Sequence, residues 1–119
     1  MKRGIITALA VGAGLTAGMV TPAAAAYYDC PDRAVCMWDD ANYGGELSWR
    51  QPGFGLWNIS WQNNDDLTSW ANRSYTRAAA YEHANGAGAC LNLVPRSSSG
   101  WVGSWWNDRI SSWKTNGSC

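Results

Sequence analysis

Two stretches of the sequence share one pattern: Asn64-Asp65-Asp66-Leu67-Thr68-Ser69-Trp70 and Asn107-Asp108-Arg109-Ile110-Ser111-Ser112-Trp113. Both read Asn-Asp-x-aliphatic-hydroxyl-Ser-Trp, and they lie 43 residues apart. The same offset carries Ala41-Asn42 onto Ala84-Asn85 and Asp39 onto Glu82, with no gap between Trp38 and Trp113. Two copies of about 40 residues are too few for a repeat array. The pattern therefore predicts a duplicated unit, at about 35–70 and 78–113, folded into one domain.

The first residues have the layout of a secretory signal peptide. Lys2 and Arg3 precede an apolar run, which small residues end at Ala24-Ala25-Ala26. A charged start, a short apolar stretch and an Ala-x-Ala site are typical of export signals. We expect residues 1–26 to be removed, leaving residues 27–119 as a single secreted, monomeric domain without a membrane span.

Composition restricts the partners of this domain. Removing Lys2 and Arg3 from nine basic residues leaves seven against nine acidic ones, which argues against nucleic acid as a ligand. A domain of this size usually needs covalent or metal support. Four cysteines allow three disulfide pairings. We predict the pairing of nearest neighbours, Cys30–Cys36, which leaves Cys90–Cys119. The cysteine spacings and the single histidine do not suit a structural zinc site.

Short strand-like pieces alternate with turn residues along the mature chain. In the first copy the strands are expected near 34–38, 46–50, 56–61 and 67–70, and in the second near 75–81, 89–94, 101–105 and 110–113. Ser97 and its neighbours in 96–100 are expected to be flexible. No segment shows helical periodicity with caps. The sequence predicts an all-β protein of eight short strands in two four-stranded units.

The first hairpin resembles a known family. Trp38-Asp39-x-x-x-Tyr43-x-Gly45 is similar to the hairpin signature of the βγ-crystallin Greek key, and the Asn-Asp loops resemble the calcium motif of microbial βγ-crystallins. The resemblance implies two Greek-key motifs forming a disulfide-stabilised β-sandwich. Together with the export signal and the cysteine positions, it is most similar to secreted bacterial metalloproteinase inhibitors of βγ-crystallin-like fold. One departure is Gly86, which stands where the first copy has Tyr43, so the second hairpin lacks its aromatic corner.

The same resemblance implies a calcium site in each Asn-Asp loop. Hard cations prefer oxygen ligands. Carboxylates would come from Asp65 and Asp108, hydroxyls from Thr68 and Ser111, and backbone carbonyls from Asp66 and Arg109. Ser69 and Ser112 would be packing hydroxyls. The alternative is that Asn and Asp only form turns before the last strand of each copy.

Nine tryptophans suggest a second kind of site. Flat aromatic faces stack on sugars, and Trp57, Trp101 and Trp106 are the candidates for such a surface. The competing interpretation is that large aromatics provide the core of a small domain. On that interpretation five tryptophans alternate with polar residues on strands and face inward: Trp38, Trp49, Trp61, Trp70 and Trp113.

The sequence does not support an enzyme. His83 is the single histidine, and no Gly-x-Ser-x-Gly elbow occurs. Asp39-Asp40 and Asp65-Asp66 are adjacent carboxylates in turns, which are usually solvated or face a metal. The leading hypothesis is a secreted inhibitor of extracellular metallopeptidases. The alternatives are a calcium-binding structural domain without a protease target and a carbohydrate-binding module.

The inhibitory contact is expected on the second hairpin, at Cys90, Leu91 and Leu93. Leu47 and Trp49 alternate with Ser48 and Arg50 and are predicted to face the core. The 43-residue offset then places Leu91 and Leu93 where Ser48 and Arg50 point outward. The alternative is that the second copy has a shifted register and buries both leucines. The resemblance implies a reactive bond at a disulfide-bonded cysteine followed by an apolar residue, attacked by a thermolysin-like zinc protease.

Overall fold

The computed structural model describes residues 26–59 and 66–119, so the export signal predicted up to Ala26 lies almost wholly outside the described residues, as do Trp61 and Asp65. The described part contains eight strands and two single-turn 3₁₀ helices. In chain order these are β1 (Val35–Asp40), η2 (Ala41–Tyr43), β2 (Gly44–Arg50), β3 (Trp57–Asn58), β4 (Ser69–Asn72), β5 (Ala78–Tyr81), η3 (Ala84–Gly86), β6 (Cys90–Leu93), β7 (Ser97–Ser99) and β8 (Ser112–Lys114).

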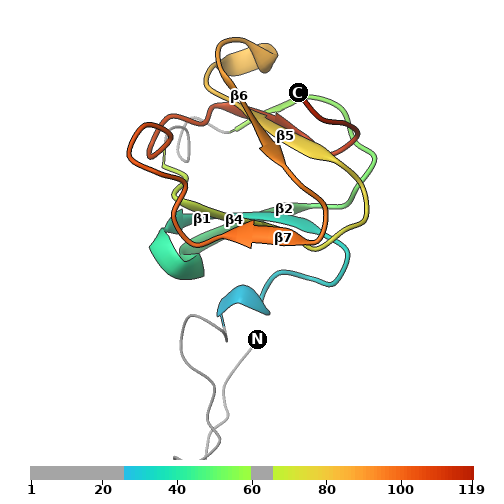
Figure 1. The fold of residues 1–119 in the computed structure, drawn as a ribbon, viewed down its shortest axis with the longest axis vertical. Coiled ribbons are helices and arrows are strands. Elements are labelled where there is room, and N and C mark those ends of the chain that lie inside the picture. The colour runs from blue at the N-terminus through green and yellow to red at the C-terminus, as the bar shows by residue number, and fades with distance from the viewer. Residues whose placement is uncertain (1–25, 60–65) are drawn as a thin grey trace, which may run out of the picture.

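The strands form two antiparallel sheets that face each other as a sandwich (Figure 1). Sheet A has the order β2-β1-β4-β7, and sheet B has the order β3-β8-β5-β6. The β-sandwich of eight strands predicted from the sequence is therefore correct. Within the described residues, no helix is long and apolar enough to cross a membrane.

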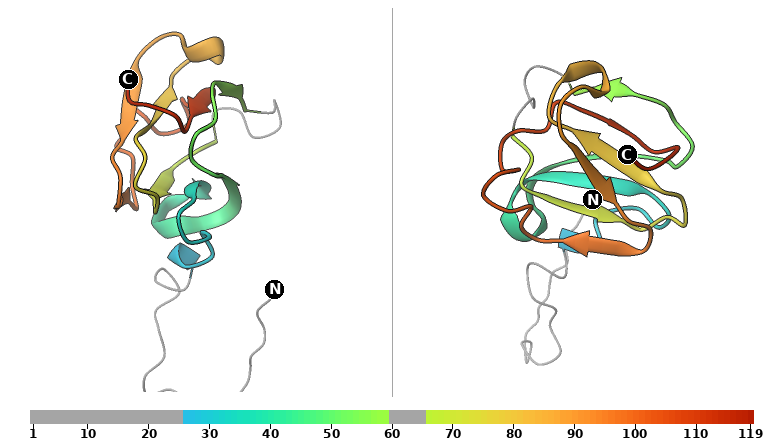
Figure 2. Two further views of the ribbon diagram at one scale, coloured as in Figure 1. Left: turned by 90° about the vertical axis from the view of Figure 1, so that its right-hand side faces the viewer. Right: turned by 45° about the horizontal axis from the view of Figure 1, so that its top comes forward.

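Each copy of the repeat gives one strand to the sheet of the other copy. β3 follows β2 in the chain but pairs with β8 of sheet B, whereas β7 pairs with β4 of sheet A. Figure 2 shows the two layers from two further directions. The expected strand at 101–105 is wrong, because that region forms turns and the pairing strand lies earlier, at Ser97–Ser99. Within the stretch 96–100, Ser97–Ser99 form β7 at the edge of sheet A.

The hairpins of the two copies have the same register. Met37 lies opposite Ser48 in the β1–β2 pair, and Ala80 lies opposite Leu91 in the β5–β6 pair, which are equivalent positions at the 43-residue offset. The alternative of a shifted register is therefore wrong. The prediction is wrong in another respect, namely which side of β2 and of β6 faces the space between the sheets.

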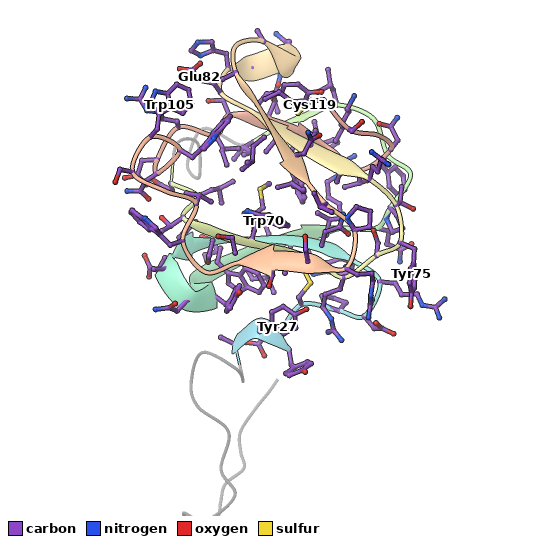
Figure 3. All side chains as sticks on the ribbon, in the orientation of Figure 1. Tyr27, Trp70, Tyr75, Glu82, Trp105 and Cys119 are labelled. Carbon is purple, nitrogen blue, oxygen red and sulfur yellow. A yellow bond between two sulfur atoms is a disulfide. The ribbon has the colours of Figure 1, made fainter. Side chains whose placement is uncertain are left out.

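The main core lies between the sheets, and a smaller one lies outside sheet A. The larger cluster is apolar and comes from both copies: Val35, Met37, Leu67, Trp70, Ala78, Ala80, Leu93, Ile110 and Trp113. The smaller contains Cys30, Cys36 and Trp38, with Tyr27, Tyr43 and Leu47 packed against it. Figure 3 shows Trp70 between the sheets and Tyr27 on the outer side of sheet A. Alternate residues of β1 therefore serve two different cores.

The smaller core explains why the prediction that Leu47 and Trp49 point between the sheets is wrong. Leu47 packs outward against the small cluster, and Trp49 beside it is 47% exposed, so Trp49 is not a core residue. Ser48 and Arg50 lie opposite Met37 and Val35, on the side that faces the other sheet. Of the five tryptophans predicted to be buried, Trp38, Trp70 and Trp113 are buried. An apolar alternation shows that a strand has a buried face, but not which side covers it.

Gly86 preserves the hairpin geometry without the aromatic corner. Asn42 and Tyr43 of η2 have φ values of 55° and 64°, and Asn85 and Gly86 of η3 have 60° and 73°. Glycine adopts this left-handed conformation without strain. A Cβ at position 86 would lie 3.0 Å from Leu56 Cδ1, so the Leu56 side chain would have to shift to admit one. The two turns therefore have the same backbone with different sequences.

Candidate functional site

Leu67 and Thr68, which follow the first Asn-Asp loop, lie against the second loop. Thr68 Oγ1 donates a hydrogen bond of 2.8 Å to Asn107 Oδ1 of the other loop. The Asp108 N–H donates to the Leu67 carbonyl at 3.3 Å, and the Val102 N–H donates to the Thr68 carbonyl at 2.9 Å. The duplicated motifs thus form one joint region at the end of the sandwich.

Ser69 and Ser112 pack as the resemblance implied. Ser69 Oγ donates to the Asp40 carbonyl at 2.7 Å and accepts from the Tyr43 N–H at 3.0 Å. Ser112 Oγ donates to the His83 carbonyl at 2.6 Å and accepts from the Gly86 N–H at 3.0 Å. Both hydroxyls are buried. Each therefore fastens the hairpin turn of its own copy to the strand that follows the Asn-Asp loop.

Acidic side chains gather beside the first loop. Burial raises the pKa of Asp39 above its ordinary value, and the carboxylates of Glu46, Asp66 and Asp40 raise it further. These residues come from the β1–β2 hairpin and from the loop, which the fold brings together. Their combined negative charge makes this region attractive to a cation.

The second loop has a different charge arrangement. A small polar cavity of about 320 Å³ is lined by residues that include Glu82, Asp108 and Ser111. The Arg109 guanidinium lies 3.8 Å from the Glu82 carboxylate, and it also stacks over Trp105 at 4.9 Å. Glu82 is equivalent to Asp39 at the 43-residue offset. The repeat therefore could have predicted that Glu82 lies beside the second loop. Arg109 partly neutralises this loop, whereas the first loop keeps its acidic character.

The oxygen atoms expected to bind calcium are positioned unequally. Asp66 and Asp108 are exposed, Thr68 is buried, and Ser111 is half-buried. Asp65 lies outside the described residues. Within 26–59 and 66–119, no three His, Cys, Asp or Glu side chains lie close enough together to hold a metal. A cation here would need hydroxyl and carbonyl oxygens besides carboxylates, which is the donor set that calcium accepts.

Both predicted disulfides are present. Cys30–Cys36 joins residues six apart, and Cys90–Cys119 joins residues 29 apart. The Cys119 N–H also donates to Asn92 Oδ1 at 2.9 Å. The C-terminus is therefore fastened to β6, the edge strand of sheet B.

The outward orientation predicted for Leu91 and Leu93 is wrong. Leu93 is fully buried in the main core, and Leu91 packs against it from a half-buried position. The reason is that this side of β6 faces sheet A, just as the equivalent side of β2, which carries Ser48 and Arg50, faces sheet B. Cys90 is half-buried, and Ala87 and Gly88 just before it are exposed. The accessible part of this hairpin is thus the approach to Cys90.

The tryptophans suggested for sugar binding do not form one surface. Trp57 is 61% exposed and lies on β3, while Trp101 is 50% exposed and lies after β7. Trp106 packs against the main core. Their separate positions give no shared platform.

The fold and the paired loops define a βγ-crystallin-type domain, and comparison with solved structures agrees. A βγ-crystallin domain from Clostridium beijerinckii is 32% identical, with a TM-score of 0.58, over 68% of this chain and 94% of that one. A βγ-crystallin domain from Flavobacterium johnsoniae is 26% identical, with a TM-score of 0.57, over 74% and 100%. A structure from work on the evolution of the eye-lens βγ-crystallin domain fold has a TM-score of 0.60 at 20% identity, over 71% and 87%, and shows the fold alone.

The model of peptidase inhibitor family I36 matches residues 23–93, more than half of the sequence. The chain belongs to this family. A comparison with curated proteins found no match. Membership makes the protein a peptidase inhibitor with a protease partner and not an enzyme, in agreement with the sequence prediction.

Proposed function

We propose that the protein is a secreted inhibitor of extracellular metallopeptidases, with a thermolysin-like zinc protease as its target. Membership of the inhibitor family supports the general role. The two disulfides suit an oxidising, extracellular environment. The observation that carries the choice of site is the Cys90–Cys119 bridge, which lies directly before the apolar residue Leu91.

The proposed contact is the segment that leads into β6, with the Cys90–Leu91 peptide bond at its centre. The exposed residues Ala87 and Gly88 give a protease access to this bond from the N-terminal side. Leu93 supports the segment from within the core and does not contact the protease. Leu91, which is half-buried, would enter the protease only after local opening of the start of β6.

Hydrolysis of this bond would leave the inhibitor in place. Addition of water would create a carboxylate on Cys90 and an amine on Leu91. Cys90 would still be joined to Cys119 by the disulfide, while Leu91 would be held by its pairing with Ala80. Keeping both new ends in the cleft slows product release, which favours a stalled complex.

The test is to incubate residues 27–119 with thermolysin and, separately, with a serine protease such as subtilisin, and to measure residual activity. We expect thermolysin alone to be inhibited. Mass spectrometry of the complex should show a nick between Cys90 and Leu91, whose fragments separate only after reduction. A nick elsewhere would exclude this contact, and inhibition of neither enzyme would exclude the proposed target class.

The matched variants remove one disulfide each. The double substitution Cys90→Ser and Cys119→Ser should convert the inhibitor into a substrate, because the nicked segment can then leave. The double substitution Cys30→Ser and Cys36→Ser should keep inhibition in molecules that remain folded by circular dichroism. Equal inhibition by both variants would contradict the role of the Cys90 bridge.

We also propose calcium binding as a second function, supported by the acidic group around Asp39 and by the oxygen atoms of the first loop. Asp65, Asp66 and Thr68 would hold the ion there, and Asp108, Arg109 and Ser111 would form the weaker second site. The ion would supply positive charge that joins the loop to the β1–β2 hairpin. A domain with this function alone would bind calcium and leave every protease active.

Calcium should raise the melting temperature, because a ligand that binds only the folded state stabilises it by mass action. Asp65→Ala should reduce this shift more than Asp108→Ala, since Arg109 already partly neutralises the second loop. The measurement is thermal unfolding followed by circular dichroism in millimolar calcium and in chelator. Superimposable melting curves would mean that the loops are only turns.

A further inference from the structure

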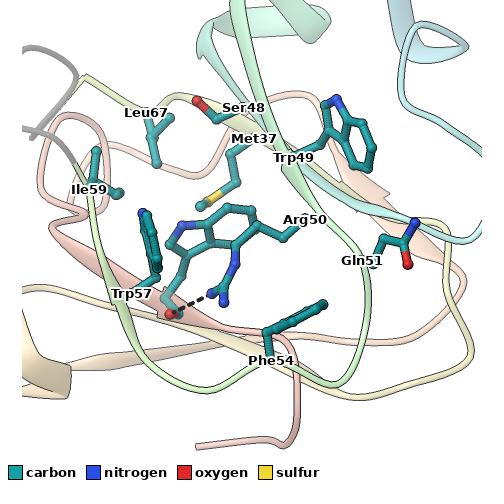
Figure 4. Close-up of a pocket in the computed structure, with 10 residues that line it drawn as sticks. Met37, Ser48, Trp49, Arg50, Gln51, Phe54, Trp57, Ile59 and Leu67 are labelled. Atoms are coloured by element: carbon teal, nitrogen blue, oxygen red, sulfur yellow. Dashed lines mark hydrogen bonds between the residues drawn. The ribbon is translucent and has the colours of Figure 1, made fainter.

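An open cleft lies between the edges of the two sheets on the side of β2 and β3. Its volume is about 530 Å³, within the range of small-molecule sites. Met37, Leu67 and Trp113 of the main core give it an apolar lining. Arg50, Phe54 and Trp57 also line it, as Figure 4 shows. Cys90 and Leu91 are not among the residues that line this cleft.

The cleft exists because the two copies of the repeat differ at two inward positions. Leu91 and Leu93 fill the space between the sheets on the β6 side. The equivalent residues of the first copy are Ser48 and Arg50, which face the same inter-sheet space from β2. A serine is much smaller than a leucine, and a guanidinium cannot close an apolar core. The first copy therefore opens a space that the second copy fills.

The Arg50 guanidinium is held among aromatic rings. Its central carbon lies 5.5 Å from the ring centroids of Phe54, Trp57 and Trp113. Nη1 donates to the Gly55 carbonyl at 3.0 Å and more weakly to the Trp113 carbonyl at 3.4 Å. These contacts fix the orientation of a side chain that is otherwise flexible. The cation is thus preorganised at the entrance of an apolar cleft.

No carboxylate within the described residues pairs with this cation. Arg73 and Arg96 each lie within 4 Å of Asp32, and Arg109 lies close to Glu82, but Arg50 has no such partner. Its Nε and Nη2 atoms make no hydrogen bond to the described residues, and none of the buried polar side-chain atoms there lacks a partner. The free edge of the guanidinium is therefore in contact with solvent. Burial lowers the pKa of Arg50, which reflects the cost of holding an unpaired charge here.

We infer that this cleft binds a small amphipathic carboxylate, with an apolar body between the sheets and its carboxylate on Arg50. The free edge of a guanidinium matches a carboxylate through two parallel hydrogen bonds. Met37, Leu67 and Trp113 offer the body an apolar surface. This ligand site lies beyond the inhibitor function proposed above and does not depend on it.

Neutral sugars fit the cleft less well. Sugar hydroxyls need several hydrogen-bond acceptors, and among the described residues no Asp or Glu lines the cleft. A purely apolar ligand would leave the Arg50 charge unpaired in a less polar surrounding, which is costly. A ligand with one negative end and one apolar end satisfies both parts of the site.

The test uses 4-phenylbutyrate as the probe and its neutral amide, 4-phenylbutanamide, as the matched control. Binding is followed by NMR, through the indole N–H signals of Trp57 and Trp113. We expect saturable shifts with the carboxylate and at least tenfold weaker binding of the amide. Equal affinity for the two probes, no binding of either, or shifts caused instead by a neutral disaccharide would overturn the inference.

Two variants locate the site. Arg50→Leu introduces the residue that the second copy has at this position and should abolish binding of the carboxylate. Ser48→Leu keeps the Arg50 contacts but fills the cleft, so it should also block binding and decides the matter if Arg50→Leu does not fold. Arg96→Met is the control, because Arg96 stacks on Tyr75 at 4.8 Å away from the cleft and should not affect binding. Unchanged binding by a folded Arg50→Leu or Ser48→Leu variant would contradict the assignment.

Discussion

At the scale of single residues, Asn72 makes hydrogen bonds that join separate parts of the chain, and the repeat does not predict these bonds. It is fully buried on β4. Its Nδ2 donates to the Leu93 carbonyl at 2.7 Å and to the Thr76 carbonyl at 2.9 Å. Its Oδ1 accepts from the Ser74 N–H and from the Ser74 hydroxyl, at 2.9 and 2.6 Å. One side chain therefore ties sheet A to β6 and orders the connection between the two copies.

Replacing Asn72 by alanine should lower the free energy of unfolding by about 2–4 kcal/mol, because the Leu93 and Thr76 carbonyls and the Ser74 N–H and hydroxyl each lose a hydrogen bond. Urea denaturation followed by tryptophan fluorescence measures this change. Asn58→Ala is the matched control, since Asn58 is exposed and bonds the exposed Asn85. A loss no greater than that of the control would show that water replaces the Asn72 side chain.

At the scale of elements, each hairpin turn depends on one buried serine. Ser69 and Ser112 make equivalent pairs of hydrogen bonds to η2 and η3, although Tyr43 and Gly86 differ at the turn. The serine hydrogen bonds are the same in both copies, whereas the side chain at the turn is not. The distance in sequence between the turn and its serine is the same in both copies. This shared spacing, and not the aromatic corner, therefore specifies the backbone of the turn.

Ser69→Ala and Ser112→Ala should destabilise the domain by similar amounts, about 1–3 kcal/mol each, because each removes two hydrogen bonds from a partly buried carbonyl and a partly buried N–H. Thermal and urea unfolding of the two variants checks this. Ser104→Ala, at an exposed turn position, serves as the control and should change stability little. A large effect at one serine alone would show that the two turns are not equivalent.

At the scale of the whole molecule, each end of the domain is fastened to a different sheet. Cys30–Cys36 holds the N-terminal segment against β1, where Tyr27 contacts Tyr43 at 5.3 Å and Tyr43 contacts Trp38 at 5.0 Å. Cys90–Cys119 fastens the C-terminus to β6. The two disulfides thus stabilise opposite layers of the sandwich.

The native protein should contain no reactive thiol, and reduction should destabilise it strongly. The chain-entropy model gives about 3–4 kcal/mol for the longer loop and about 2 kcal/mol for the shorter. Thiol titration of the unreduced protein, followed by urea unfolding with and without reductant, measures both effects. Two reactive groups in the unreduced protein would contradict the pairing.

Much of this architecture could be predicted from the sequence, because the 43-residue offset fixes the register of both hairpins. The exchange of β3 and β7 between the sheets could not be predicted. The three serines of β7 show no alternation of polar and apolar residues, so the sequence does not indicate their partner strand. The side of β2 that points between the sheets could not be predicted for a related reason. The sequence shows that residues 48 and 50 differ in polarity from residues 91 and 93, but not that all four face the space between the sheets. Arg50 and its cleft therefore appear only when both sheets are in place.

The exchanged strands also have a consequence for how the chain acquires its structure during synthesis. β7 completes sheet A, and β8 occupies an inner position of sheet B, yet both lie within residues 97–114. Neither layer can be completed while the last fifth of the chain is still inside the ribosome. Both sheets are therefore completed only when synthesis of the chain is nearly finished.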